Sequence, residues 1–140
     1  MMPVKIMVLF VCIENSCRSQ MAEAFARHLG AGMIEAYSAG SKPGGSINPD
    51  AIKVMGESGM DISRSKPKGF IDLKGKEFDY VITMGCQDTC PFIPAKKHID
   101  WAITDPRGKG LEFFREIRDE IKNKIQEFIK TAEENNGKTF

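Results

Sequence analysis

The sequence predicts a single α/β domain built around a doubly wound parallel sheet. Apolar runs typical of buried strands alternate along the chain with segments whose apolar residues recur at helical spacing. The 140 residues suit one domain, and 41% hydrophobic with 28% charged side chains is an ordinary globular composition. Because the chain has no repeat, low-complexity segment or obvious linker, we expect one domain over residues 1–140.

Four segments are predicted to be strands. Residues 6–11 are continuously apolar and β-prone, as expected of a parallel strand covered on both faces. Further strands are predicted at residues 33–39, 78–84 and 97–101. Ligands bind beyond the carboxyl ends of the strands in such sheets, so the residues after the first and third strands are candidate site positions.

Three helices are predicted between and after these strands. Gly30 is expected to stop the first helix, and Asn48-Pro49 suits the N-cap and first position of a second helix that ends at Gly59. The last helix has the clearest apolar stripe, and a polar tail from Glu133 is expected to fray. The stripes of the first and last helices are Met21, Ala22, Phe25, Ala26 and Leu29, and Leu111, Phe114, Ile117, Ile121, Ile125, Phe128 and Ala132.

Charge and cysteine content exclude several classes of protein. The 20 basic and 19 acidic side chains nearly cancel, so neither nucleic acid nor a membrane surface is an expected partner. The longest apolar stretch, residues 6–13, is too short to span a bilayer and no cleavage site follows it, so we expect a cytoplasmic protein. In a reducing cytosol the clusters Cys12/Cys17 and Cys86/Cys90 indicate metal, redox or nucleophilic chemistry rather than structural disulfides.

The connection between the first strand and the first helix combines a nucleophile with an anion site. Its successive backbone N–H groups can converge on an anion at a helix N-terminus. Arg18 adds a planar fork of donors suited to a tetrahedral oxyanion, and the same positive ends favour the thiolate of Cys12. Ser19 can donate to that thiolate, and Asn15 suits a left-handed backbone position. The predicted oxyanion-binding residues are Ile13, Glu14, Asn15, Ser16, Cys17, Arg18 and Ser19.

A C-x5-R pattern alone is a weak signal. Cys12 can instead end a buried strand as an inert apolar residue, with Arg18 solvated on the helix surface. The position of the pattern between a buried strand and an amphipathic helix favours the anion site.

The sequence around this loop resembles a known family. The run VCIENSCRSQMAEA at residues 11–24 is similar to the signature of the low-molecular-weight protein tyrosine phosphatases and of the arsenate reductases that share their fold. The resemblance continues through Tyr37-Ser38-Ala39-Gly40, Asn48-Pro49, Met60-Asp61-Ile62-Ser63 and Thr104-Asp105-Pro106. It implies a four-stranded parallel sheet flanked by helices, with Cys12 as nucleophile and Asp105 as general acid, although an Asp-Pro pair alone is only a turn signal.

Three features favour an arsenate reductase, with a tyrosine phosphatase as the alternative. Gln20 stands where the phosphatases commonly have proline. No tyrosine follows Asp105-Pro106, where the phosphatases usually have aromatic residues. Cys86 and Cys90 are not needed by a phosphatase and resemble the two extra cysteines of thioredoxin-coupled arsenate reductases.

The resemblance implies a relay of thiols. Cys12 attacks arsenic and displaces hydroxide, Cys86 attacks the Cys12 sulfur as arsenite departs, and Cys90 then attacks Cys86. Because a disulfide needs Cα atoms within about 7 Å, residues 84–94 must move during this cycle. The implied reductant is thioredoxin or a low-molecular-weight thiol, no cofactor is implied, and we expect a monomer.

Some residues depart from the pattern or have other interpretations. Glu14 puts a carboxylate in the anion loop and is expected to point to solvent, and Cys17 is expected to be a packed bystander. The four cysteines could instead bind zinc in a protein that is not an enzyme, but their C-x4-C and C-x3-C spacings fit zinc poorly, so no metal is expected. His28 and His98 are expected to be structural or surface residues.

Overall fold

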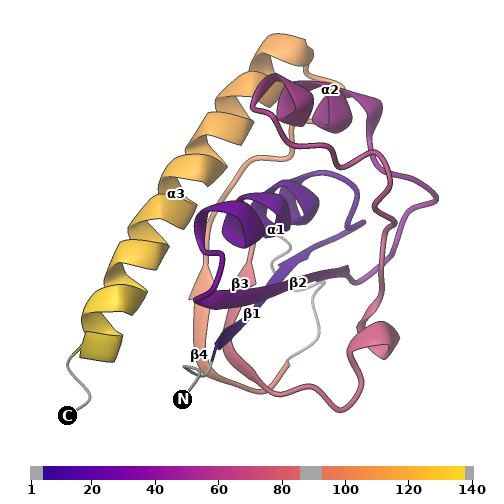
Figure 1. Ribbon diagram of the computed structural model, residues 1–140. Coiled ribbons are helices and arrows are strands. Elements are labelled where there is room, and N and C mark those ends of the chain that lie inside the picture. Colours follow the sequence, from indigo (N-terminus) through magenta and orange to yellow (C-terminus); the bar gives the residue numbers. More distant parts are fainter. Residues whose placement is uncertain (1–4, 86–92, 138–140) are drawn as a thin grey trace.

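A four-stranded parallel sheet forms the centre of the computed structural model, which describes residues 5–85 and 93–137 (Figure 1). Its order is β2-β1-β3-β4, and every pairing is parallel. The four predicted strands are confirmed, with small differences at their ends of the kind usual for such boundaries. They are β1 (Ile6–Cys12), β2 (Ile34–Gly40), β3 (Phe78–Thr83) and β4 (Ala95–Asp100).

The strand order indicates a ligand site beside the end of β1. The chain passes from β1 to β2 on one side and then returns to put β3 on the other side of β1. Such a reversal of strand order opens a crevice at the carboxyl ends of the strands. In the register of the sheet, Cys12 lies opposite Gly40 and Val11 lies opposite Thr83, so the last residues of β1, β2 and β3 meet at one edge.

The three predicted helices are present as α1 (Arg18–Leu29), α2 (Pro49–Glu57) and α3 (Leu111–Gly137). Gly30 caps α1, and the side chain of Asn48 caps α2 by accepting from the Asp50 N–H at 2.8 Å. Gly59 terminates α2 as predicted, because it follows the C-cap Ser58 with φ at +82° and donates its N–H to the Gly56 carbonyl at 3.0 Å. The C-terminal tail differs from expectation, because α3 continues to Gly137 and residues 133–137 are helical rather than frayed.

The two faces of the sheet are covered unequally. Val8 and Phe10 face a core formed with α1, α2 and α3, whereas Leu9 and Val11 face a smaller core on the other side. Among the described residues, that second face is covered by the short 3-10 helix η1 (Phe70–Leu73) and loops rather than by an α-helix (Figure 1). The predicted four-stranded parallel sheet flanked by helices is confirmed, and in the described part of the chain its α-helices gather on one face.

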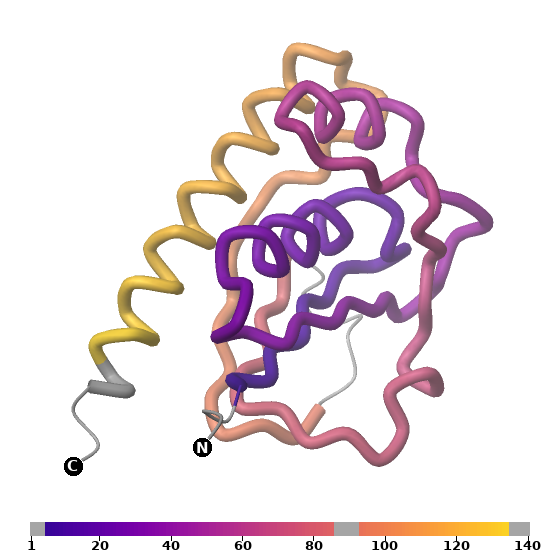
Figure 2. Tube along the Cα trace, viewed as in Figure 1, coloured from indigo at the N-terminus to yellow at the C-terminus, as the bar shows by residue number. Residues whose placement is uncertain are grey.

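The cause lies in the segment between α2 and β3. Residues 58–77 are rich in lysine and glycine and lack apolar residues at helical spacing, so only η1 forms there. Figure 2 shows this segment descending from α2 to η1 as an extended trace. As a result its backbone passes beside the residues that follow β1.

Helix α3 is anchored along its length. The predicted stripe is confirmed, and Phe128 packs edge-on against Tyr80 of β3 with ring centroids 4.9 Å apart. At the other end, Glu57 of α2 accepts from Arg115 and Arg118, which lowers the pKa of the Glu57 carboxyl to about 2, mainly through Arg115. No helix in the described part of the chain is apolar enough over a sufficient length to cross a membrane.

Candidate active site

The residues after β1 form a loop whose carbonyl groups point outward. The carbonyl oxygens of residues 13–16 each accept a hydrogen bond from outside the loop, and the donors are Lys42 N at 2.8 Å, Gly44 N at 2.9 Å, Gln20 Nε2 at 3.2 Å and Asn48 N at 2.9 Å. Within each peptide plane the N–H group points opposite to the carbonyl. The N–H groups of Glu14, Asn15, Ser16 and Cys17 are therefore turned toward the inside of the loop, as an anion cradle requires.

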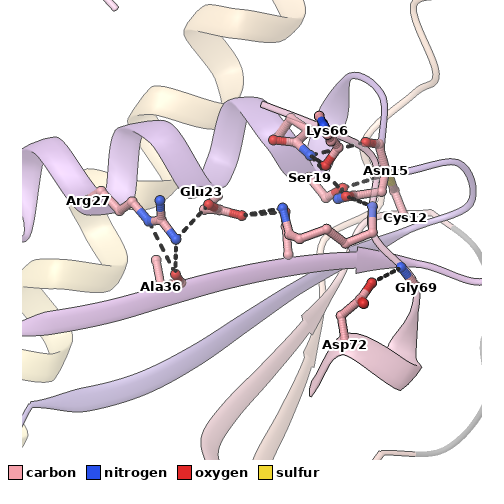
Figure 3. A network of polar contacts seen from close by, with 12 residues as sticks. Cys12, Asn15, Ser19, Glu23, Arg27, Ala36, Lys66, Gly69 and Asp72 are labelled. Carbon is pink, nitrogen blue, oxygen red and sulfur yellow. Dashed lines mark hydrogen bonds and ion pairs between the residues drawn. The ribbon is translucent and has the colours of Figure 1, made fainter. Parts of the chain in front are cut away.

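Asn15 holds the loop in this shape. It is fully buried with φ at 53°, the left-handed conformation that the sequence predicted. Its Oδ1 accepts from Lys68 N at 2.7 Å and from Gln20 Nε2 at 2.9 Å, and its Nδ2 donates to Ser19 Oγ at 2.7 Å (Figure 3). These bonds tie the loop to α1 and to the extended segment before η1.

The sulfur of Cys12 lies 2.8 Å from Ser19 Oγ. The hydroxyl of Ser19 already accepts a hydrogen bond from Asn15, so its own hydrogen is free to point at the sulfur. Ser19 is thus placed to donate to the Cys12 thiolate, as the sequence predicted. Both residues are buried, Cys12 at the end of β1 and Ser19 in the first turn of α1, where the helix dipole favours negative charge.

Arg18 is a buried cation, and one of its hydrogen-bond donors has no partner among the described residues. Its Nη1 donates to the carbonyls of Met84 at 2.5 Å and Ile103 at 2.9 Å, which fixes the guanidinium between two loops. Among the described residues, its buried Nε has no acceptor. Leaving a buried charged donor unpaired is costly, and an oxyanion bound in the loop would supply the missing acceptor.

Two glycines permit this arrangement. A Cβ atom on Gly85 would lie 2.7 Å from Arg18 Nη1, and the φ of Gly85 is +85°. A Cβ atom on Gly40 would lie 2.5 Å from the Ile13 carbonyl oxygen. Both positions therefore require glycine for close approach.

Asp105 reaches the same edge from the segment after β4. Its carboxylate lies 3.9 Å from Arg18 Nη2 and accepts from Arg107 through Nε at 2.9 Å, Nη2 at 2.7 Å and the backbone N–H at 3.1 Å. The thiol of Cys17 lies 3.9 Å from the same carboxylate. The structure thus brings Asp105 together with the loop predicted to bind the anion.

Glu14 has a partner that the sequence did not predict. Its side chain is 37% exposed, in line with the expectation that it points to solvent, but its carboxylate also forms an ion pair with Arg107 Nη1. No periodicity or motif in the sequence links residue 14 to residue 107, since the contact depends on the chain returning to this edge after β4. The sequence did not indicate a role for Arg107 in the site.

Cys17 is buried in the helical core, as expected of a packed bystander. Burial raises the pKa of its thiol to about 12, and the nearby Cys12 and Asp105 add to the effect. At neutral pH it is therefore a neutral thiol and a poor nucleophile.

The remaining candidate residues are less informative. Cys86 and Cys90 lie outside the described residues; the chain before them is described as far as Gly85, which lies against Arg18. His28 is exposed, and His98 is hydrogen-bonded to the Ile93 carbonyl at 2.6 Å. Over residues 5–85 and 93–137, no group of three or more His, Cys, Asp or Glu side chains could hold a metal ion.

A buried carboxylate supports the loop from behind. Glu23 on α1 forms ion pairs with Arg27 at 2.9 Å and Lys68 at 3.5 Å, and it accepts from the Ser38 hydroxyl (Figure 3). Lys68 donates its backbone N–H to Asn15, so this network connects α1 and β2 to the brace of the anion loop. The buried charge is compensated by two cations, as buried carboxylates require.

Comparison with known proteins gives consistent matches over most of the chain. The family described as low molecular weight phosphotyrosine protein phosphatase matches residues 7–138. The chain is 40% identical over 139 residues to a protein named arsenate reductase from Shouchella clausii, which covers 92% of this chain and 99% of that protein. It is 39% identical over 125 residues to a protein named glutaredoxin arsenate reductase from Synechocystis sp., which covers 87% of this chain and 95% of that protein.

Similar solved structures are also described as arsenate reductases. One described as an arsenate reductase in the phosphate binding state is similar with a TM-score of 0.81 and 37% identity, covering 90% of this chain and 98% of that one. The thioredoxin-dependent arsenate reductase of Corynebacterium glutamicum is similar with a TM-score of 0.78 and 36% identity, covering 94% of this chain and 63% of that one.

Proposed function

The chain belongs to the low molecular weight phosphotyrosine protein phosphatase family, and we propose that it acts there as an arsenate reductase, converting arsenate to arsenite. The observation that carries this is the match along nearly the whole chain to proteins named arsenate reductase. The loop after β1 supports it, because inward N–H groups and the unpaired Arg18 Nε suit a tetrahedral oxyanion.

In the first step the Cys12 thiolate attacks arsenic while the loop and Arg18 hold the arsenate oxygens. Ser19 stabilises the thiolate before attack. Asp105 enters this step protonated and donates its proton to the departing oxygen, so that water rather than hydroxide leaves and Asp105 is left as the carboxylate that Arg107 holds. The product is a bond between Cys12 sulfur and pentavalent arsenic.

In the second step the Cys86 thiolate attacks the Cys12 sulfur. The new bond is the Cys12–Cys86 disulfide, and the electron pair of the broken sulfur–arsenic bond stays on arsenic, which leaves as arsenite. Cys90 then attacks Cys86, which frees Cys12 and forms Cys86–Cys90. The position of Gly85 against Arg18 supports this order, because Cys86 is the next residue in the chain.

The arrangement of the aromatic residues favours a reductase over a phosphatase of aryl esters. Tyr37 lies in β2 against Phe78, and Tyr80 lies in β3 against Phe128. The side chain that contacts Asp105 from its own loop is that of Arg107 rather than an aromatic residue.

Electrons reach the Cys86–Cys90 disulfide from a thiol protein, and we expect thioredoxin in the cytoplasm to supply them to a monomeric enzyme without a prosthetic group. The name of the Corynebacterium protein states thioredoxin dependence, whereas that of the Synechocystis protein states glutaredoxin. The chain is similar to both proteins, at 36% and 39% identity, so sequence identity does not choose between the two reductants. An assay with each reductant decides.

The test is arsenate-dependent oxidation of NADPH with thioredoxin and thioredoxin reductase, run beside glutathione with glutaredoxin and beside aryl-phosphate hydrolysis. We expect arsenate turnover with thioredoxin and, at most, weak hydrolysis. Cys86→Ser should form no arsenite. Cys90→Ser should form one arsenite per enzyme and stall as a Cys12–Cys86 disulfide, visible by peptide mass mapping after thiol blocking.

Cys17→Ser is the matched control, because it removes a thiol that the relay does not use. Whatever its rate, it should still release arsenite over many turnovers and form the Cys86–Cys90 disulfide. If Cys86→Ser and Cys90→Ser kept the parent turnover, while aryl phosphate was hydrolysed efficiently, the chain would be a phosphatase instead.

A further inference from the structure

Arg107 connects two loops that belong to opposite ends of the chain. Its Nη1 binds the Glu14 carboxylate in the loop after β1, and its Nε and Nη2 bind the Asp105 carboxylate in the segment after β4. Its backbone N–H also donates to Asp105 at 3.1 Å. One side chain therefore joins the anion loop to the predicted general acid.

The donors of Arg107 are already engaged, in contrast to those of Arg18. Nε, Nη1 and Nη2 of Arg107 each have a carboxylate partner. Arg18 Nε has no partner among the described residues. Arg18 is thus the guanidinium suited to receive an oxyanion, and Arg107 is suited to hold carboxylates.

The position of Glu14 explains why such a partner is needed. A carboxylate within an anion-binding loop repels the doubly charged oxyanion that the loop binds, and this repulsion falls when a cation pairs with the carboxylate. Glu14 and Arg107 are each about one-third exposed, at 37%, so the pair stands at the mouth of the site rather than in its interior. Pairing with Arg107 leaves the mouth without an unpaired negative charge from Glu14.

We infer that Arg107 is a positioning residue for the reaction, which orients Asp105 over the oxyanion site, and that Glu14 anchors Arg107 rather than binding the oxyanion with its side chain. This inference rests on the proposed function for its effect on turnover. The expected effect of Arg107 on anion binding rests only on the charges of Arg107 and Glu14. Isolated exposed ion pairs contribute little, but here the planar fork of one arginine joins two carboxylates, which fixes their relative geometry.

The test is a double-mutant cycle with Arg107→Met, Glu14→Gln and the double variant. Inorganic phosphate is the probe for anion affinity, measured by titration calorimetry, and arsenate turnover with the reductant that supports the parent gives kcat and KM. Arg107→Met leaves the Glu14 carboxylate without its cation, whereas Asp105 still lies 3.9 Å from Arg18 Nη2, so we expect phosphate affinity to fall about tenfold. In the double variant the affinity should return to within about threefold of the parent, because the Glu14 charge is gone and Asp105 keeps Arg18 as a neighbouring cation.

Turnover should behave differently from affinity. We expect kcat to fall about tenfold in Arg107→Met and to stay low in the double variant, because Arg107 no longer holds the Asp105 carboxylate in either variant. Glu14→Gln alone should lower kcat by about threefold without weakening phosphate binding. Arg107→Lys keeps the charge but loses the fork, so phosphate affinity should stay near the parent while kcat falls.

Lys109→Met is the matched control. It removes the same charge two residues further along the same loop, where Lys109 Nζ lies over the Phe113 ring at 5.8 Å rather than on a carboxylate. It should stay within about twofold of the parent in affinity and kcat, as expected of a screened exposed charge. Circular dichroism melts of all variants report whether each is folded.

Three results would overturn the inference. A loss of phosphate affinity and kcat in Lys109→Met equal to that in Arg107→Met would show a general charge effect. If the double variant bound phosphate as weakly as Arg107→Met does, Arg107 would bind the anion itself. An unchanged kcat in Arg107→Met and Arg107→Lys would show that Asp105 is positioned without Arg107. If the parent reduced no arsenate with any reductant, the proposed function would fail, while the phosphate cycle would still decide whether Arg107 masks Glu14.

Discussion

Replacing Asn15 with alanine should destabilise the protein strongly, because one side chain maintains the shape of the anion loop. The change removes the acceptor of the Lys68 N–H and the donor to Ser19 Oγ, bonds of 2.7 Å each in the structure. Gln20 Nε2 keeps two other acceptors, the carbonyls of Asn15 and Lys66, so its loss is smaller.

The magnitude follows from these contacts. Two lost hydrogen bonds contribute about 1 kcal/mol each, with about 1 kcal/mol more for the Lys68 N–H left partly buried and unpaired. Alanine at a φ of 53° adds about 1 kcal/mol of backbone strain. The expected loss is therefore about 3–4 kcal/mol, a large part of the stability of a domain, and a fall in Tm of roughly 10 °C.

Urea unfolding followed by circular dichroism measures this loss, with Asn123→Ala as the control. Asn123 is exposed on α3, so the same change of atoms there should alter stability by less than about 0.5 kcal/mol. A loss below about 1 kcal/mol for Asn15→Ala would refute the reasoning, because the loop would then hold its shape without the brace.

Further predictions concern the reacting groups. Cys12→Ser should abolish arsenate reduction, and full activity of that variant in the coupled assay would contradict the mechanism. Arg18→Lys loses the fork and the donor Nε, so phosphate inhibition and turnover should both weaken, turnover by about 10²-fold; parent-like inhibition would argue against the cradle. Asp105→Asn should lower turnover by about 10²-fold with little change in phosphate inhibition, and weakened phosphate inhibition would point to a structural role. The pKa of Cys17 is about 12 when folded against a usual value of 9.0, so its contribution to stability is present below pH 9 and is lost as the pH rises toward 12. Urea unfolding at several pH values should therefore show a flatter fall above pH 9 for Cys17→Ala, and identical slopes would exclude the burial effect.

Much of this protein is encoded in short stretches of the sequence. The four strands and three helices follow from apolar runs and helical spacing, and Asn48 and Gly30 mark helix ends because their capping chemistry is local. The loop at residues 12–19 is predictable for the same reason. A strand end, a residue suited to left-handed backbone and a helix start lie within a few residues of each other.

The tertiary structure decided the contacts between distant parts of the chain. Arg107 meets Glu14, and Lys68 meets Asn15 and Glu23, only because the segments after β4 and before η1 return to the edge where β1 ends. The unequal cover of the sheet likewise depends on the path of residues 58–77. Periodicity reports which face of an element is buried but not which loops meet. Ion pairs made by exposed or half-buried side chains therefore emerge only when the whole chain is folded.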